Sequence, residues 1–160
     1  MEKIEIKYTW DKDLALKSAQ DIYKYELQHS NKKYIGLLFI GMLQFGVVGA
    51  LKHNAYGFLV LATIGLTYWY GLRWPIRKYF ILKTFEKSPL ADKTISLTIQ
   101  NDGIYSEDKL QIEYKNIIKY VQLDDALVIY HTLGTIYLPS ASFPTSKDIK
   151  KFIKILDKNK

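Results

Sequence analysis

The sequence predicts a two-helix transmembrane hairpin joined to a small α+β domain. Three observations support this prediction: two long segments without a charged residue, a two-residue periodicity in the second half of the chain, and a closing segment with helical periodicity. The 23 Lys and Arg and 16 Asp and Glu residues all lie outside the two uncharged segments. An ordinary soluble domain intersperses its charges, because each surface helix presents a polar face to water.

We expect three parts along the 160 residues. Residues 1–30 form an N-terminal strand and helix in the cytoplasm, residues 31–88 form the hairpin with a basic amphipathic exit segment, and residues 89–160 form the β domain with its C-terminal helix. No apolar segment precedes Tyr34, so the first span is expected to act as an uncleaved insertion signal.

The N-terminal part contains two predicted elements. Residues 3–9 alternate between polar and apolar side chains, which is typical of a half-exposed strand. Asp11 is a suitable N-cap for a helix from about Lys12 to His29, because a carboxylate at this position accepts a hydrogen bond from the first helical turn.

Residues 34–51 and 55–72 match transmembrane helices in length and composition. A hydrocarbon core about 30 Å thick needs about 20 apolar residues at a rise of about 1.5 Å each. Both segments are rich in glycine, which weakens a soluble helix by about 1 kcal/mol per residue but lets membrane helices approach closely. The alternative is a soluble protein with two buried core helices, and the absence of a polar stripe in either segment argues against it. Pro75 is expected to kink or end the second helix near Trp74.

The distribution of Lys and Arg predicts that both termini are cytoplasmic, since basic residues flank both outer ends of the hairpin and only Lys52 lies in its loop. The basic residues after the second span are candidate contacts for anionic lipid headgroups, although plain positive-inside anchoring also explains them: Arg73, Arg77, Lys78, Lys83 and Lys87. The candidate membrane-interface aromatic residues are Tyr34, Trp69, Tyr70 and Trp74.

The region from 94 to 138 alternates with period two and predicts five to six short strands, with a helical step at 115–118. Turn residues separate the strands at Asn101-Asp102-Gly103, Glu107-Asp108, Asp124-Asp125 and Gly134. From about Thr145 the period returns to 3.6. The apolar face of this last helix is expected to cover a small barrel or sandwich, and it consists of Ile149, Phe152, Ile153 and Leu156.

The order of these parts resembles the YcxB-like family of bacterial membrane proteins. The matching features are the opening strand Ile4–Tyr8, the hairpin with its basic exit, and a series of short runs: Leu97–Ile104, Tyr114 to Ile117, Asp124–Tyr130, Ile136–Pro139, Phe143, and Phe152-Ile153 followed by Leu156. The family often has Trp at the position of Tyr114 and a basic residue where this chain has Ser140. The resemblance implies a multi-pass protein of the bacterial cytoplasmic (inner) membrane. It also implies a pleckstrin-homology-like C-terminal domain, a partly open β-barrel capped by the last helix.

The sequence offers no recognisable catalytic, cofactor or metal motif, so we expect no enzyme and no cofactor. The histidines at 29, 53 and 131 are scattered without carboxylates at metal-ligand spacing. Absence of Cys removes thiolate chemistry. The net charge of +7 is explained by the basic residues that flank the spans, and no nucleic-acid partner is expected.

The leading hypothesis is a membrane-anchored binding or scaffold protein that presents its cytoplasmic pleckstrin-homology-like domain to a protein partner or to anionic lipid. The alternative is an immunity-type or regulatory membrane protein that acts by direct contact with a toxin or a membrane complex. The expected partners are membrane lipid and a protein of unknown identity, and homo-oligomerisation stays open.

Overall fold

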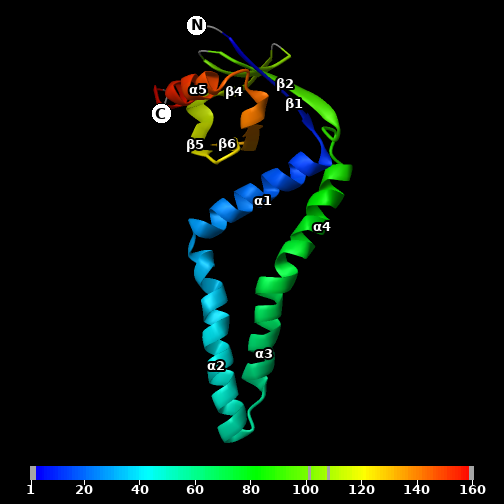
Figure 1. Cartoon of the computed structure of the whole chain (residues 1–160), viewed down its shortest axis with the longest axis vertical. Helices are drawn as coiled ribbons and strands as arrows, with labels where there is room; N and C mark the ends of the chain where they lie inside the picture. The colour runs from blue at the N-terminus through cyan, green and yellow to red at the C-terminus, as the bar shows by residue number, and fades with distance from the viewer. Residues whose placement is uncertain (1–2, 101, 108, 159–160) are drawn as a thin grey trace. The chain divides into compact units, whose positions relative to one another are not determined.

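The computed structural model describes residues 3–100, 102–107 and 109–158. Over these residues the protein is an α+β fold with helices and two antiparallel sheets (Figure 1). It divides into two compact units. Unit 1 comprises the residues up to Leu14 and those from Pro89 onward, and unit 2 comprises Ala15–Ser88. The predicted grouping of the N-terminal strand with the helix after it differs from this division, in which the strand belongs to the β domain.

Unit 1 contains a four-stranded sheet of order β1-β2-β3-β4 and a three-stranded sheet of order β5-β6-β7. The strands are β1 Ile4–Trp10, β2 Lys93–Ile99, β3 Gly103–Ser106, β4 Lys109–Glu113, β5 Ile117–Gln122, β6 Ala126–His131 and β7 Gly134–Pro139. The expected helical step is a 3-10 turn at Tyr114–Asn116, and strand β5 begins immediately after it. Two residues of the predicted turns, Asn101 and Asp108, lie outside the described residues.

The first strand pairs with the first strand after the helical segment. Strands β1 and β2 are antiparallel, with Ile6 opposite Leu97 and Trp10 opposite Lys93. Directly beyond this ladder, the Asp92 N–H donates to the Trp10 carbonyl at 2.9 Å. Residues 11–91 are therefore inserted between two neighbouring strands of one sheet.

The core of unit 1 lies between the sheets and helix α5 (Ser146–Lys158). Phe152 has no exposed surface, and its ring centroid lies 6.3 Å from that of Phe143. The predicted apolar face of this helix is confirmed for Phe152 and Leu156, which are buried, while Ile149 and Ile153 are partly buried against the core. The buried core residues are Ile4, Ile6, Leu97, Ile99, Ile104, Ile112, Tyr114, Leu127, Ile129, Leu138, Phe143, Phe152, Ile155 and Leu156.

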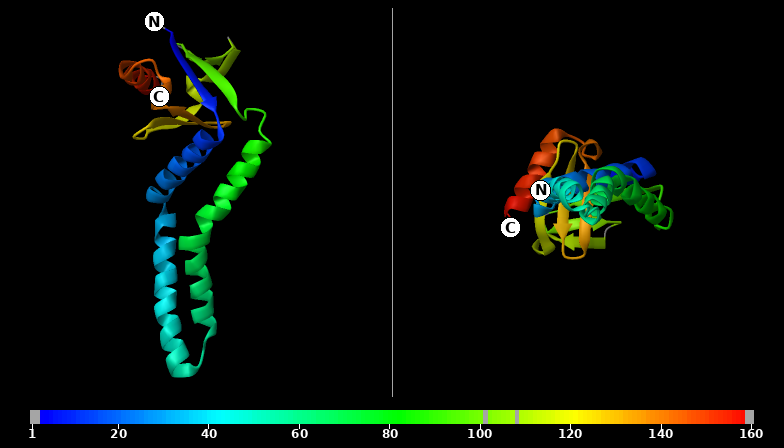
Figure 2. Two further views of the ribbon diagram at one scale, coloured as in Figure 1. Left: turned by 45° about the vertical axis from the view of Figure 1, so that its right-hand side comes forward. Right: turned by 90° about the horizontal axis from the view of Figure 1, so that it is seen from below.

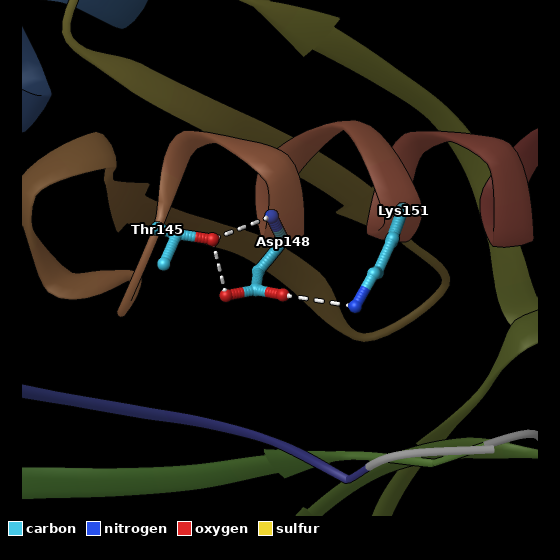
Figure 3. Close-up of polar contacts among 3 residues, drawn as sticks. All are labelled: Thr145, Asp148 and Lys151. Carbon is cyan, nitrogen blue, oxygen red and sulfur yellow. Dashed lines mark hydrogen bonds and ion pairs between the residues drawn. The ribbon is translucent and has the colours of Figure 1, made fainter.

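A side-chain cap precedes helix α5 (Figure 3). The Asp148 N–H donates to the Thr145 hydroxyl oxygen at 3.3 Å, and that hydroxyl donates to the Asp148 carboxylate at 2.7 Å. The Lys151 ammonium lies 3.5 Å from the other carboxylate oxygen. The hydrogen bond from Thr145, with Lys151 nearby, lowers the pKa of Asp148. The hydroxyl is thus a second acceptor for the Asp148 N–H in the first turn, which also donates to the Thr145 carbonyl at 3.0 Å.

Replacing Thr145 by alanine is expected to lower the free energy of unfolding by about 1 kcal/mol, because the capping hydroxyl is lost. Thermal unfolding of the purified chain would measure the change. Ser146→Ala is the matched control, since Ser146 is exposed and makes no side-chain hydrogen bond with another described residue. Equal losses in the two variants would contradict the capping role.

Unit 2 is helical. Its helices are α1 Lys12–Gln28, whose first turn belongs to unit 1, then α2 Ile35–His53, α3 Gly57–Leu66 and α4 Arg73–Glu86, with a 3-10 turn at Asn31–Tyr34 and a π-helix at Thr67–Leu72. Helices α2 and α3 lie side by side as an antiparallel pair (Figures 1 and 2). The predicted N-cap of α1 is confirmed, because the Leu14 N–H donates to the Asp11 carboxylate at 2.7 Å.

Small residues lie where the backbones of α2 and α3 approach each other closely. A Cβ atom added to the buried Gly46 would lie 2.8 Å from the backbone N and Cα of Leu59. Ala50, one turn further along α2, is also buried, and so is Ala62 on α3. The spacing of Gly46 and Ala50 is that of a small-xxx-small contact, in which small side chains let two backbones approach closely. The sequence alone left this packing face unspecified.

One helical stretch among the described residues, Asn31–His53, is long and apolar enough to cross a membrane. The second apolar segment is divided between α3 and the π-helix. In the π-helix the Arg73 N–H bonds to the Tyr68 carbonyl, five residues back. Pro75 explains this arrangement, because proline lacks an N–H and its ring collides with the carbonyl four residues earlier in a regular helix. The irregularity expected at Trp74 therefore lies before it, and the helix continues through the proline.

Candidate functional site

Two arginines and three aromatic rings of unit 2 form a cluster between α1 and α4. Its members are Tyr23 of α1, Trp69 of the π-helix, and Arg73, Trp74 and Arg77 of α4, and we call it the arginine-aromatic cluster. The guanidinium carbon of Arg73 lies 3.9 Å from the Trp69 ring centroid and 4.9 Å from the Tyr23 ring centroid. That of Arg77 lies 4.7 Å from the same Tyr23 ring. The Trp74 ring centroid is 5.9 Å from that of Tyr23.

Helical spacing brings these side chains together. Trp69, Arg73 and Arg77 are four residues apart, so they lie along one side of a continuous helical path. Helix α1 precedes the antiparallel α2–α3 pair and α4 follows it, which places both at the same end of the pair. Tyr23 therefore meets the two arginines although about fifty residues separate them in sequence.

The guanidinium groups of the cluster have unused hydrogen-bonding capacity. Nη1 of Arg73 is buried and has no hydrogen-bond partner among the described residues. Within the described part of the chain, both arginines lie against aromatic rings and neither forms an ion pair. An aromatic ring covers the flat face of a guanidinium, whereas its N–H donors point outward in the plane. This arrangement suits the binding of an anion at the guanidinium edge.

The other predicted headgroup residues lie outside the cluster. Lys78, Lys83 and Lys87 are exposed, and the Lys83 ammonium lies 5.9 Å from the Tyr79 ring centroid. Of the predicted interface aromatics, Trp69 and Trp74 are cluster members. Tyr34 is 55% exposed and has the Lys33 ammonium 5.1 Å from its ring centroid. Tyr70 is also mostly exposed, with its hydroxyl beside Gly36 at the start of α2.

Tyr23 is the cluster residue that sequence reasoning did not assign to the site. Its position at helical spacing with Ala15 and Ala19 indicated only a weakly apolar helix face. The sequence signal that could have placed Tyr23 near the arginines is the order of the helices along the chain. In a hairpin with a short loop, the helix before the first span and the helix after the second emerge at the same end, so an aromatic residue on one can cover an arginine on the other.

Polar side chains of unit 1 form hydrogen bonds with its backbone. The Tyr114 hydroxyl donates to the Gln100 carbonyl, and burial raises the pKa of Tyr114, which keeps this hydroxyl a donor. The His131 ring accepts from the Leu133 N–H at 3.2 Å. Over residues 3–100, 102–107 and 109–158 no group of three or more His, Asp and Glu side chains could hold a metal ion.

The fold defines an α+β protein in which an antiparallel β domain is combined with a helical unit. Residues 99–156 match the model of a family described as YcxB-like protein. The match confirms the resemblance predicted from the sequence, and it extends from the end of β2 into α5. No curated protein and no solved structure matches the chain.

Proposed function

We propose that this protein is a membrane-anchored binding module of the bacterial cytoplasmic membrane. In this proposal α2 forms one span, α3 and the π-helix form most of the second, and both termini lie in the cytoplasm. The observation that carries it is the exposure of the apolar helical stretch Asn31–His53. Only 17% of the most apolar 18 residues of this stretch are buried. A core helix of a soluble domain is mostly buried instead.

The energetic argument is one of magnitude. Burial of one large apolar side chain contributes about 1.5–3 kcal/mol, so exposing eight of them to water would sacrifice on the order of 10 kcal/mol. A whole domain is stable by only about 5–15 kcal/mol. A bilayer supplies the missing apolar surroundings. Eight of the apolar side chains that are at least half exposed are Leu37, Leu38, Phe45, Val48, Leu51, Phe58, Leu61 and Ile64.

The placement of basic residues supports the orientation. Helical structure continues from Gly57 to Glu86, but its uncharged part ends at Leu72, where Arg73 begins a basic segment. Arginine and lysine accumulate on the cytoplasmic side of spans. Between the two apolar segments the one Lys or Arg is Lys52, which lies in the last turn of α2. The arginine-aromatic cluster then lies at the level of the cytoplasmic headgroups.

We further propose that unit 1 is a pleckstrin-homology-like, partly open barrel capped by α5, held close to the inner leaflet by the hairpin. Two antiparallel sheets followed by a closing helix support this fold, as does the family match. The proposed role is binding or scaffolding, because arginines and aromatic rings recognise anionic groups and do not supply a nucleophile or a base. Tethering raises the effective concentration of such a domain at the membrane surface.

Cysteine labelling in intact cells tests the topology, and the chain contains no cysteine that would give a background. His53→Cys, at the end of α2, is expected to react from outside with a membrane-impermeant maleimide. Lys150→Cys, on the exposed face of α5, is expected to react only after lysis. Both residues are exposed, so accessibility depends on the side of the membrane. Labelling of both variants before lysis, or of neither after it, would contradict the proposal.

A further inference from the structure

We propose that the arginine-aromatic cluster binds the phosphodiester of an anionic phospholipid in the cytoplasmic leaflet. This inference rests on the proposed membrane anchoring and names the ligand of the site. It also narrows the five predicted headgroup residues to two, Arg73 and Arg77, which the structure holds against Tyr23.

The geometry of Arg73 provides the first argument. Its Nη1 is enclosed without a hydrogen-bond partner among the described residues, whereas Nε and Nη2 are not enclosed and form no hydrogen bond within this part of the chain. Nε–H and one N–H of Nη2 form a side-on fork that matches two oxygens of a phosphate. Trp69 at 3.9 Å holds the guanidinium plane in place. The fork is therefore positioned before an anion arrives, which reduces the entropy lost on binding.

The pairing of two cations provides the second argument. Arg73 and Arg77 both lie against the ring of Tyr23, and no carboxylate among the described residues forms an ion pair with either. Two like charges that share a partly buried site repel each other. An anion bound at both guanidinium edges would remove this repulsion and form several charge-assisted hydrogen bonds.

The surroundings favour a lipid over free phosphate. Exposed apolar side chains adjoin Arg73 in sequence, with Leu72 at 49% and Ile76 at 42% exposure. A phospholipid can place its phosphate at the arginines and its acyl chains along such apolar surface. The cytoplasmic leaflet is also rich in anionic lipids, and basic pockets between helices on this side are suited to their headgroups.

Lipid titration of the full chain in a neutral detergent tests the proposal, with native mass spectrometry as the readout. The probes are phosphatidylglycerol, phosphatidylcholine and inorganic phosphate. We expect phosphatidylglycerol to bind at least about tenfold more tightly than the other two, and Arg73→Gln and Arg77→Gln each to remove about tenfold of that affinity, because a hydrogen bond between charged groups is lost.

Two further variants distinguish specific binding at the arginine-aromatic cluster from nonspecific attraction of the lipid to positive charge. Lys78→Gln removes the same charge from the same helix, but Lys78 is exposed and outside the cluster, so we expect a change of less than about twofold. Arg73→Lys keeps the charge and loses the fork, so we expect a loss comparable to that of Arg73→Gln. If Arg73→Gln is not monodisperse, the same loss of phosphatidylglycerol affinity is measured with Arg77→Gln and Tyr23→Leu instead.

Equal losses for Lys78→Gln and Arg73→Gln would overturn the proposed site. Equally tight binding of inorganic phosphate would overturn the lipid as its ligand. Neither result would affect the membrane anchoring, which is tested separately by the labelling of His53→Cys and Lys150→Cys. Failure of that labelling with retained phosphatidylglycerol selectivity would instead overturn the topology and leave the binding site in place.

Discussion

Replacing Phe152 by alanine is expected to lower the free energy of unfolding of the β domain by about 3–5 kcal/mol. Phe152 has no exposed surface, and it belongs to the cluster that joins α5 to both sheets. Alanine removes most of that contact area and leaves a cavity that the surrounding strands cannot fill. A loss of this size is a large fraction of the total stability of a domain.

Denaturant unfolding of the detergent-solubilised chain, followed by hydrogen exchange of the amides of β6, would measure this loss in unit 1. Lys154→Ala on the exposed face of the same helix is the matched control, and we expect it to change the stability by less than about 0.5 kcal/mol. Similar losses in both variants would show that α5 contributes through helix formation alone and not through the burial of Phe152.

The second large effect is expected in the helical pair. Gly46→Ala adds a Cβ atom 2.8 Å from the backbone of Leu59, and a backbone cannot yield as the end of a flexible side chain can. Helices α2 and α3 must then move apart. We expect a destabilisation of about 1–3 kcal/mol, which is typical of overpacking. Thermal unfolding of unit 2 in detergent, followed by helical circular dichroism, would measure it.

Gly41→Ala provides the matched control on the same helix. Apart from its chain neighbours and the backbone of its own helix, a Cβ atom at this position has no heavy atom within 4 Å. Alanine favours helix over glycine by up to about 1 kcal/mol, so this variant is expected to be neutral or slightly more stable. If Gly46→Ala were as stable as Gly41→Ala, the close approach of α2 and α3 at Leu59 would be wrong.

Local periodicity predicted much of the secondary structure. Strand β2 follows the alternation of residues 94–100, with Leu97 and Ile99 buried. Gly134, expected to close the last hairpin, is the first residue of β7 and directly follows the turn. The C-terminal helix was also predictable, because its apolar residues recur at helical spacing. These features depend on near neighbours in sequence, and such neighbours were sufficient to identify them.

Contacts between distant residues were not predictable in the same way. Nothing local indicates that β1 pairs with β2, that Tyr23 covers Arg73, or that Gly46 rather than Gly41 faces the second helix. The π-helix was missed because the effect of Pro75 appears several residues before the proline itself. The candidate headgroup residues were predicted from their charge, but which of them lie together depends on how α1 and α4 are arranged at the end of the α2–α3 pair.

The pairing of β1 with β2 has a consequence for the order of events during synthesis. Residues 4–10 leave the ribosome first, yet their partner, residues 93–99, is made only after both apolar segments have been translated. The nascent strand β1 must therefore stay unpaired until residues 93–99 have been synthesised. A fragment that starts at Pro89 would also expose the edge of β2 that Ile4 and Ile6 normally cover.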